Sequence, residues 1–413
     1  MIIDRPYIED IGNECFLISN IKDEKNHIEE KFFFSVSNEY KKYLVDDVAD
    51  AFVVAMLLPA LISGQNIKVN APLTDILYYH LENSLIYLLS KVFKKNPIKI
   101  VPEETLKIDF NSSAVGTGFS GGIDSFSTVT QHISENCPEN LKITHLTLFN
   151  VGSYGNNFGN TQKAFISDLK RAESFANEVN LPIVSLNSNI SSAYTAKEIF
   201  HFSSRSSMCL GAGVLSLQKL FSRYLISSSG VLEDIRFVQH DQYFYEPLIF
   251  PLLSNNNTQI VLSNANLDRV EKTKNLLNND MAQRHLYVCA SDIYNEKHGT
   301  DFKKDTKPNC SECIKCTRTM LTLDILNSLN KYSNRFDIDK YNNLRKELIY
   351  QTIQRKNIDH FSKEIYDLMI KENFSDIKEI NKKSFRGEFK TKLLKNKIVF
   401  FIYINFLRKL LKK

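Results

Sequence analysis

Residues 114–125 read Ala-Val-Gly-Thr-Gly-Phe-Ser-Gly-Gly-Ile-Asp-Ser, and this stretch decides the fold. Its first half, 114–119, has the apolar pattern of a short buried strand. Two adjacent glycines follow, and then Phe126, Val129 and Ile133 recur at the spacing of one helix face. A strand, a glycine turn and a helix start predict a cradle for phosphate groups. Glycine lets backbone N–H groups approach a ligand, and a helix N-terminus attracts negative charge.

The side chains of the turn fit the same chemistry. Ser120 and Ser125 supply hydroxyl donors, and Asp124 supplies the only charge in residues 120–125. A carboxylate beside phosphate groups commonly helps to hold Mg²⁺. We therefore expect the serines to bind phosphate and Asp124 to place the metal ion.

Other glycine motifs fit less well. Residues 116–121 also spell G-x-G-x-x-G, but a dinucleotide-binding fold needs an acidic residue about 20 positions later, after the next strand. The next predicted strand, 142–150, ends in Asn150. A kinase-type P-loop requires a lysine after the glycines, and none follows here. An ordinary glycine-rich turn without a ligand is the remaining alternative.

The loop resembles the SGGxDS loop of the PP-loop ATP pyrophosphatases at every fixed position. The resemblance implies that ATP is split between its α and β phosphates and that AMP is attached to a substrate oxygen, from which a nucleophile displaces it. It implies catalytic roles for Asp124 and Ser120. The ATP-binding residues that it implies in the loop are Ser120, Gly121, Gly122, Ile123, Asp124 and Ser125.

Four cysteines form a second pattern. Cys310, Cys313 and Cys316 make a C-x₂-C-x₂-C run, and Cys289 precedes it. Thiolates at this spacing can converge on one tetrahedral Zn²⁺, and a site closed by four sulfur atoms is structural rather than catalytic. We therefore expect a zinc clamp.

Three alternatives to this clamp stay open, one of which is that the cysteines are free core thiols without a metal. The three closely spaced cysteines could hold an iron–sulfur cluster, with a fourth ligand elsewhere. His285 or His298 could also replace Cys289 as a zinc ligand.

The loop and the cysteines together resemble 7-cyano-7-deazaguanine synthase, the QueC/ExsB-like branch of the superfamily. That resemblance covers about half of the chain, roughly residues 113–320. It implies ATP, Mg²⁺ and structural zinc as cofactors, and a carboxylate that is adenylated and then attacked by ammonia. Leu267–Lys272 matches a helix start of the family, so Arg269 is expected to reach the phosphates. Arg205 stands where the family has an arginine before a helix; it either meets phosphate or the substrate carboxylate, or is a surface residue at a helix start.

The sequence departs from the family after the second strand. Residues 149–154 read Phe-Asn-Val-Gly-Ser-Tyr and lack the family's arginine and histidine, and the segment 295–307 is longer. The acceptor is therefore open: a small molecule, or a sugar, peptide or protein joined through an amide bond in a modification or defence pathway. A nucleotide-binding subunit without turnover is an alternative of another class.

The order of the predicted elements gives the fold class. Strand patterns alternate with helix patterns, and this predicts an α/β fold with a parallel sheet and helices on both faces. The resemblance makes it PP-loop/HUP-like, with a Rossmann-like core. Phe149 and Asn150 then lie at the carboxyl edge of the sheet, where adenine is expected. The strands are predicted at 142–150, 183–186, 224–227, 260–263 and 286–290, and the helices at 161–179 and 205–221.

The flanking segments suggest three domains. We expect an N-terminal α+β domain over residues 1–110, the PP-loop domain with the metal site over 111–320, and a helical region over 321–413. The last thirty residues are basic and aromatic. A terminal helix packed on the domain is favoured there, with RNA, an acidic partner or a membrane surface as the alternative.

Composition narrows the class of protein. A net charge of +5 over 413 residues does not require a nucleic-acid partner. Seven cysteines, an odd number, fit a reducing compartment, and no apolar run reaches the length of a membrane span. We expect a soluble cytoplasmic protein whose ammonia, if used, comes from solution or from a partner protein.

Overall fold

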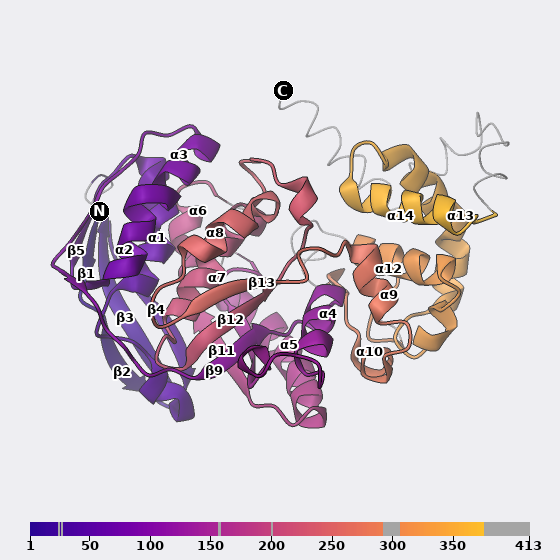
Figure 1. The fold of residues 1–413 in the computed structure, drawn as a ribbon, viewed down its shortest axis with the longest axis horizontal. Coiled ribbons are helices and arrows are strands. Elements are labelled where there is room, and N and C mark those ends of the chain that lie inside the picture. The colour runs from indigo at the N-terminus through magenta and orange to yellow at the C-terminus, as the bar shows by residue number, and fades with distance from the viewer. Residues whose placement is uncertain (24, 26–27, 156–157, 200, 292–305, 376–413) are drawn as a thin grey trace. The chain divides into compact units, whose positions relative to one another are not determined.

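The computed structural model describes the chain except for residues 24, 26–27, 156–157, 200, 292–305 and 376–413 (Figure 1). It separates into two compact units. The first comprises Met1–Ser120 and Ser127–Asn266, and the second comprises Gly121–Phe126 and the chain from Leu267 onward. The first strands of the chain join the sheet of the first unit, and the domain boundaries expected near residues 110 and 320 stay a prediction.

In the described residues the first unit contains one sheet of eleven strands and a pair of short strands. The strands of the large sheet are β1 (Ile2–Asp4), β2 (Tyr7–Ile11), β3 (Glu14–Asp23), β4 (Ile28–Ser37), β5 (Ile67–Asn70), β7 (Ile100–Pro102), β9 (Ala114–Gly118), β10 (His145–Asn150), β11 (Ile183–Ser188), β12 (Phe221–Ser227) and β13 (Gln259–Ser263). The short pair is β6 (Leu73–Thr74) and β8 (Thr105–Leu106).

Helices surround this sheet and also form most of the described part of the second unit. Those of the first unit are α1 (Asp50–Ser63), α2 (Asp75–His80), the π-helical turn η2 (Leu81–Leu85), α3 (Ile86–Phe93), α5 (Phe158–Glu178), α6 (Ser191–Thr195), α7 (Ser206–Leu215) and α8 (Glu246–Leu252). Helix α4 (Ile123–His132) begins in the second unit and ends in the first. The second unit adds α9 (Arg269–Asn275), α10 (Asp280–His285), α12 (Ile314–Ile325), α13 (Ile338–Arg355) and α14 (His360–Lys371).

The core of the sheet confirms the predicted parallel arrangement. Its strands lie in the order β13-β12-β9-β10-β11, and all neighbours in this run are parallel. The chain moves from β9 to β10 and β11 on one side, and then returns to β12 and β13 on the other. Sheets of this kind bind ligands where the direction reverses, at the carboxyl ends of the two central strands. Ser120 leaves the sheet at this switch point.

Both faces of the core are covered by helices. Successive side chains of a strand point to opposite faces, and β10 shows where each face is buried. Leu148 packs in a cluster with Phe165 of α5. Phe149 belongs to the large core that includes α1 and α7. The predicted α/β fold with two covered faces is therefore present.

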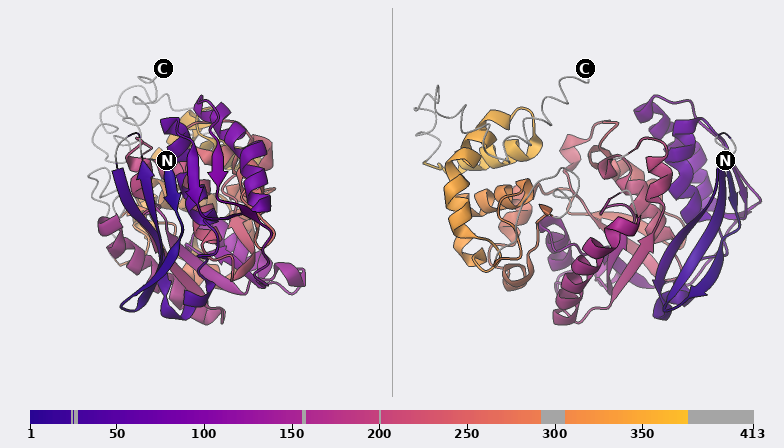
Figure 2. Two further views of the ribbon diagram at one scale, coloured as in Figure 1. Left: turned by 90° about the vertical axis from the view of Figure 1, so that its left-hand side faces the viewer. Right: turned by 180° about the vertical axis from the view of Figure 1, so that it is seen from behind.

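The N-terminal strands extend the same sheet. β4 pairs antiparallel with β11, through Asn187 opposite Ser35 and Ser188 opposite Phe34, and β3, β1, β5 and β7 follow. Figure 1 shows β1, β3 and β5 at the end of the first unit that is farthest from β13, and Figure 2 shows the indigo N-terminal strands in two further views. The apolar helix α1 packs against α7. Residues 1–110 thus contain strands and helices, as expected, but share a sheet with the core.

Three elements differ from the sequence-based expectation. Residues 286–290 form no strand, because backbone N–H groups there bond to a loop and to an asparagine side chain rather than to a neighbouring strand. The helix expected over 205–221 ends at Leu215, and β12 begins at Phe221. The sequence pattern also predicts one long helix over residues 75–93, where the structure has the π-helical turn η2 between α2 and α3.

Candidate functional site

The glycine loop has a backbone that only glycine adopts easily. Gly121 has a φ of +75°, and a Cβ atom placed there would meet Cβ of Tyr287 at 3.4 Å. The N–H of Tyr287 donates to the carbonyl oxygen of Gly121 at 2.7 Å. Positive φ is costly for other residues, so the sequence must place glycine at this turn.

The loop leads directly into the first turn of α4. The N–H of Phe126 and the hydroxyl of Ser125 both donate to the carbonyl oxygen of Gly122, each at 3.0 Å. The N–H groups of a first helical turn point toward the preceding loop and carry a partial positive charge. Ser120, which directly precedes Gly121 in the chain, is exposed. The loop therefore has the local build that the sequence predicts for a phosphate cradle.

Asp124 meets two cations within the second unit. Nη2 of Arg269 donates to Oδ2 of Asp124, and Nζ of Lys272 lies 3.7 Å from Oδ1. Arg269 stands 145 positions after Asp124, so folding brings together two residues that the sequence singled out separately. Lys272 is 1% exposed along its side chain. The acid thus lies in a setting that attracts anions.

Each member of the Asp124–Arg269 pair keeps one buried atom without a hydrogen bond. Among the described residues, Oδ1 of Asp124 accepts none and Nε of Arg269 donates none. A buried polar atom without a partner is costly and commonly marks a functional group or a missing ligand. A carboxylate oxygen suits Mg²⁺, and a guanidinium N–H suits a phosphate oxygen. The donor set fits both groups.

Further side chains of the second unit adjoin this pair. The guanidinium carbon of Arg269 lies 5.0 Å from the ring centre of Phe361, and that of Arg318 lies 3.8 Å from it. Glu364 accepts the N–H of Arg269 at 3.2 Å. Burial, followed by the charge of Asp268, raises the pKa of Glu364 to about 7.

Lys315 also belongs to this charged group. Although its side chain is exposed overall, its ammonium group is crowded by protein, and this burial lowers its pKa; the charges of Arg318 and Arg269 act in the same direction. Sequence analysis missed Lys315 and Arg318 as candidate residues. Their spacing of three on α12 was the available signal, because residues so spaced share a helix face.

Arg205 occupies a different environment. It is 0% exposed at the start of α7, and its Nη1 donates to the carbonyl oxygens of Ser191 at 3.1 Å and Ile199 at 3.3 Å. Its guanidinium carbon lies 5.2 Å from the ring centre of Tyr194. The alternative of a surface arginine is therefore wrong. A contact of Arg205 with phosphate or substrate stays a prediction.

The end of β10 is packed as a core position. Phe149 is buried, and its ring stacks on that of Tyr224 with centroids 5.8 Å apart. Asn150 is also buried and donates through Nδ2 to Asn187 at 3.0 Å and to Thr161 at 3.2 Å. Both residues lie at the carboxyl edge of the sheet, as expected. Their contact with adenine stays a prediction.

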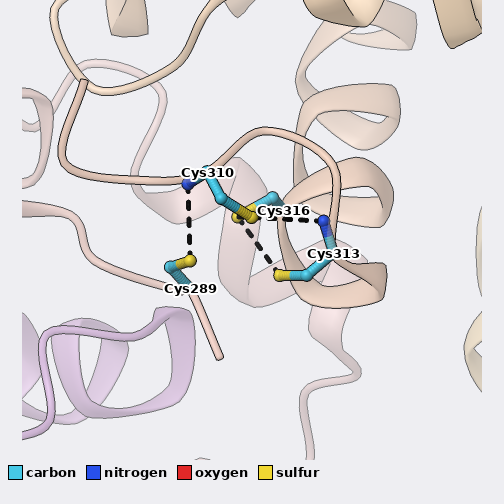
Figure 3. Close-up of side chains that lie close together, drawn as sticks. All are labelled: Cys289, Cys310, Cys313 and Cys316. Carbon is cyan, nitrogen blue, oxygen red and sulfur yellow. Dashed lines mark hydrogen bonds between the residues drawn. The ribbon is translucent and has the colours of Figure 1, made fainter. Parts of the chain in front are cut away.

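The four cysteines come together as the sequence predicts (Figure 3). All four sulfur atoms lie within 4.8 Å of one another. Sγ of Cys313 and Sγ of Cys316 are 3.5 Å apart, and Sγ of Cys310 and Sγ of Cys316 are 3.9 Å apart. A tetrahedral ion about 2.3 Å from each sulfur would place the sulfur atoms about 3.8 Å apart. The cluster therefore fits one metal ion.

Backbone N–H groups and the neighbouring thiols favour the charged form of Cys289. The N–H of Cys310 points at Sγ of Cys289 at 3.4 Å, and that of Cys313 points at Sγ of Cys310 at 3.3 Å. Hydrogen bonds from the other thiols, first that of Cys310, hold the pKa of Cys289 well below its usual range. Thiolates are the form that binds a metal ion. No histidine belongs to the cluster in the part of the chain that the structure describes, so the His285 alternative is not favoured.

Asn309 builds the frame of the cluster, and sequence analysis missed it. Its Oδ1 accepts the N–H groups of Val288 at 2.9 Å and Cys289 at 3.1 Å. Its Nδ2 donates to the carbonyl oxygens of Leu286 and Arg335, each at 3.1 Å. One buried amide thus ties the segment before Cys289 to the segment before Cys310. No spacing rule in the sequence marks such a residue.

Three expectations lie outside the described residues: a ligand role for His298, the longer segment 295–307 except its last two residues, and the basic C-terminal tail.

Comparisons with protein-family models, with curated proteins and with solved structures found no match. Among the described helices, none combines the length and the apolar character that crossing a lipid bilayer requires. The function of this chain is therefore inferred from its own residues.

Proposed function

We propose that this protein is an ATP-dependent adenylating ligase of the PP-loop type. The observation that carries the proposal is the meeting of Asp124 with Arg269 and Lys272 at the start of α4. This helix start directly follows β9, the strand at which the sheet order reverses. Ligands of doubly wound sheets bind at that position, and a positively charged helix start there suits phosphate.

The charges around the loop favour a nucleotide with several phosphates. Arg269 and Lys272 lie beside one carboxylate, Asp124, so cations are in excess. A second acid, Glu364, has its pKa raised to about 7 by burial first, so it contributes less than a full negative charge near neutral pH. ATP with Mg²⁺ would balance this excess: Oδ1 of Asp124 offers an oxygen ligand to the ion, and Arg269 offers N–H groups to phosphate oxygens.

The proposed reaction is adenylation followed by displacement. A carboxylate oxygen of the acceptor forms a bond to the α phosphorus, and the bond from that phosphorus to the oxygen of pyrophosphate breaks. Mg²⁺ supplies charge neutralisation at the phosphates. The N–H groups of the loop and Arg269 stabilise the negative charge that collects on the leaving pyrophosphate. Ammonia or another nucleophile then attacks the acyl carbon and releases AMP.

The cysteine cluster is proposed to hold a structural Zn²⁺. Sulfur distances of 3.5 and 3.9 Å suit one ion, whereas a cluster of several iron atoms separates its thiolates further. Four sulfur ligands leave no position for substrate. Cys313 caps α12 and Cys316 lies in its first turn, so the ion would fix the start of the helix that carries Arg318.

Replacement of Cys313 by serine tests this clamp. We expect the zinc content of Cys313→Ser to fall from one ion per chain to a small fraction of that, measured by plasma emission spectrometry. The α12 region should then exchange amide hydrogens faster. Iron in the purified wild type, or an unchanged zinc content in the variant, would reject the zinc site.

A peptide, protein or sugar acceptor is a second candidate. It is favoured by the departure from the family after Asn150, where no arginine or histidine is present to recognise a deazapurine. Tyr154 does not take their place, because its ring packs on Phe165 with centroids 5.7 Å apart.

One assay tests the proposed function and sorts the acceptors. The full chain is incubated with ATP, Mg²⁺ and ammonium, and in separate arms with 7-carboxy-7-deazaguanine, a sugar acid or a mixture of peptides. AMP and pyrophosphate are measured together. We expect equal amounts of the two products in one arm. ADP as the product, or bound ATP with no AMP in any arm, would overturn the ligase proposal; the second result would favour a nucleotide-binding subunit.

A further inference from the structure

We propose that helix α14 of the C-terminal region is part of the phosphate site, and that its Phe361 and Glu364 position two arginines, Arg269 and Arg318, that together bind the pyrophosphate group. This inference rests on the proposed function. It gives a role to a segment that lies outside the part of the chain resembling the PP-loop enzymes. It also adds Arg318 to the residues that contact the leaving group.

Phe361 gives both arginines a common surface. The guanidinium carbons of Arg269 and Arg318 lie 5.0 and 3.8 Å from its ring centre. A guanidinium over an aromatic face is held there by its charge, and its N–H groups point outward in the guanidinium plane. Two like charges near one another need such support. Stacking on Phe361 therefore reduces the freedom of both side chains before a ligand arrives.

Glu364 fixes the backbone of the same arginine. Its carboxylate accepts the N–H of Arg269, the first residue of α9, at 3.2 Å. Asp268 accepts the N–H of Glu271 at 2.7 Å in the same helix start. The first N–H groups of a helix have no acceptor within the helix, and here two of them bond to side chains: one to the N-cap Asp268 and one to Glu364 of α14. Arg269 is held at both its backbone and its guanidinium.

The four side chains border one small cavity. Arg269, Arg318, Phe361 and Glu364 all line it. Its volume of about 10 Å³ is no larger than one water molecule needs. The side chains are therefore neighbours, packed too closely for a phosphate group to enter between them. The ligand is therefore proposed to contact the arginines outside this cavity, and to contact Arg269 on the side of Asp124, with which its Nη2 bonds.

The charge balance selects the ligand. Arg318 and Lys315 project from α12, and Arg269 and Lys272 project from α9. The β and γ phosphates of ATP, which leave as pyrophosphate, together carry more negative charge than the single phosphate of AMP. Several cations on two helices therefore suit pyrophosphate better than AMP. Arg318 is expected to contribute charge-assisted hydrogen bonds, and Phe361 to act through the arginines as a positioning residue.

Titration calorimetry with the full chain tests the inference. The ligands are magnesium pyrophosphate, magnesium ATP and AMP, and the variants are Arg318→Gln and Phe361→Leu. Because charge-assisted bonds are lost, Arg318→Gln should bind pyrophosphate and ATP about tenfold to a hundredfold more weakly than wild type. A several-fold loss is expected in Phe361→Leu. The affinity for AMP should stay within about twofold of wild type. General unfolding would instead weaken the binding of all three ligands.

The chain offers a matched control pair. The guanidinium carbon of Arg345 lies 5.1 Å from the ring centre of Phe374, and Arg345 pairs with Asp324 at 2.7 Å. Arg345→Gln and Phe374→Leu therefore remove an arginine–aromatic contact that involves neither Asp124 nor Phe361. They should leave pyrophosphate affinity unchanged. Arg318→Lys, which keeps the charge, should recover part of the affinity and keeps the test valid if Arg318→Gln folds poorly.

The outcomes separate the two proposals. If wild type binds neither ATP nor pyrophosphate, the proposed function fails and the inference falls with it. If wild type binds ATP but Arg318→Gln and Phe361→Leu bind pyrophosphate as tightly as wild type, the inference alone is wrong. An equal loss of pyrophosphate and AMP affinity in Phe361→Leu would also overturn it.

Discussion

Two buried or nearly buried aspartates, Asp50 in the first unit and Asp124 in the second, have opposite surroundings. Asp50 is fully buried at the start of α1 and accepts four hydrogen bonds from neutral groups. The donors are Thr74 N at 2.9 Å, Thr74 Oγ1 at 2.7 Å, Gln218 Nε2 at 3.1 Å and Asn255 Nδ2 at 3.2 Å. Asp124 instead lies beside Arg269 and Lys272, and its Oδ1 accepts no hydrogen bond from the described residues.

The difference separates a structural carboxylate from a candidate ligand. Burial raises the pKa of Asp50, and the hydrogen bonds from Thr74, Gln218 and Asn255 act against that shift. Every oxygen of Asp50 is used to join α1 to other parts of the unit. Asp124 keeps one oxygen and Arg269 keeps one N–H without such use. A site that awaits a ligand is expected to show this incomplete bonding.

The largest expected effect is on activity at Asp124. Asp124→Asn keeps the size of the side chain but removes the charge that would hold Mg²⁺. We expect the rate of AMP formation to fall about 10³-fold, because loss of a group that places the metal ion removes stabilisation of the transition state. AMP release is followed by chromatography. Activity within tenfold of wild type would show that Asp124, like Asp50, has only a structural role.

The next effect is on stability at Asp50. Asp50→Ala removes the acceptor of the N–H and hydroxyl of Thr74 and of the amide of Gln218, so we expect the free energy of unfolding to fall by about 3–5 kcal/mol. Urea unfolding of the first unit measures this loss. Asp47→Ala is the matched control, because Asp47 makes an exposed pair with Lys219 and should cost less than about 1 kcal/mol. Equal losses in the two variants would contradict the contrast drawn here.

The smallest effect is a pH dependence at a third acid, Glu364. Burial raises its pKa from 4.5 to about 7 in the folded chain. The folded state therefore holds a proton that the unfolded state releases, and the stability that this proton contributes is lost as the pH rises from about 4.5 to 7.

Glu364→Gln removes this titration and keeps an acceptor for the N–H of Arg269. The stability of the variant relative to wild type should therefore rise between pH 5 and pH 8, by at most about 3 kcal/mol. Parallel urea titrations at several pH values measure the difference. A difference that stays constant across this range would mean that Glu364 is already ionised at pH 5, as an exposed acid would be.

Local patterns predicted much of the fold. β10, β11, β12 and β13 are short apolar runs bounded by turns, and each lies within a few residues of its predicted place. The pairing of β4 with β11 could not be predicted, because tertiary packing rather than local sequence selects strand partners so far apart. It is also the reason that residues 1–110 join the core sheet.

The candidate site was predictable where its residues are close in sequence. The glycine loop and the C-x₂-C-x₂-C run can be recognised in the sequence from the spacing of their residues. Arg269 was suggested only by resemblance to a family, and the sequence did not predict its pairing with Asp124. Phe361 and Glu364 had no signal, because α14 is an ordinary amphipathic helix whose contacts with α9 and α12 are set by packing.

Titration of the wild-type chain and of Arg269→Gln with magnesium ATP tests the central claim most directly. The claim is that Asp124 and Arg269 meet in order to hold the phosphates of ATP. We expect wild type to bind ATP and Arg269→Gln to bind it about tenfold to a hundredfold more weakly, because charge-assisted bonds to phosphate are lost. Equal affinity in the two proteins, or no binding by wild type, would contradict the claim.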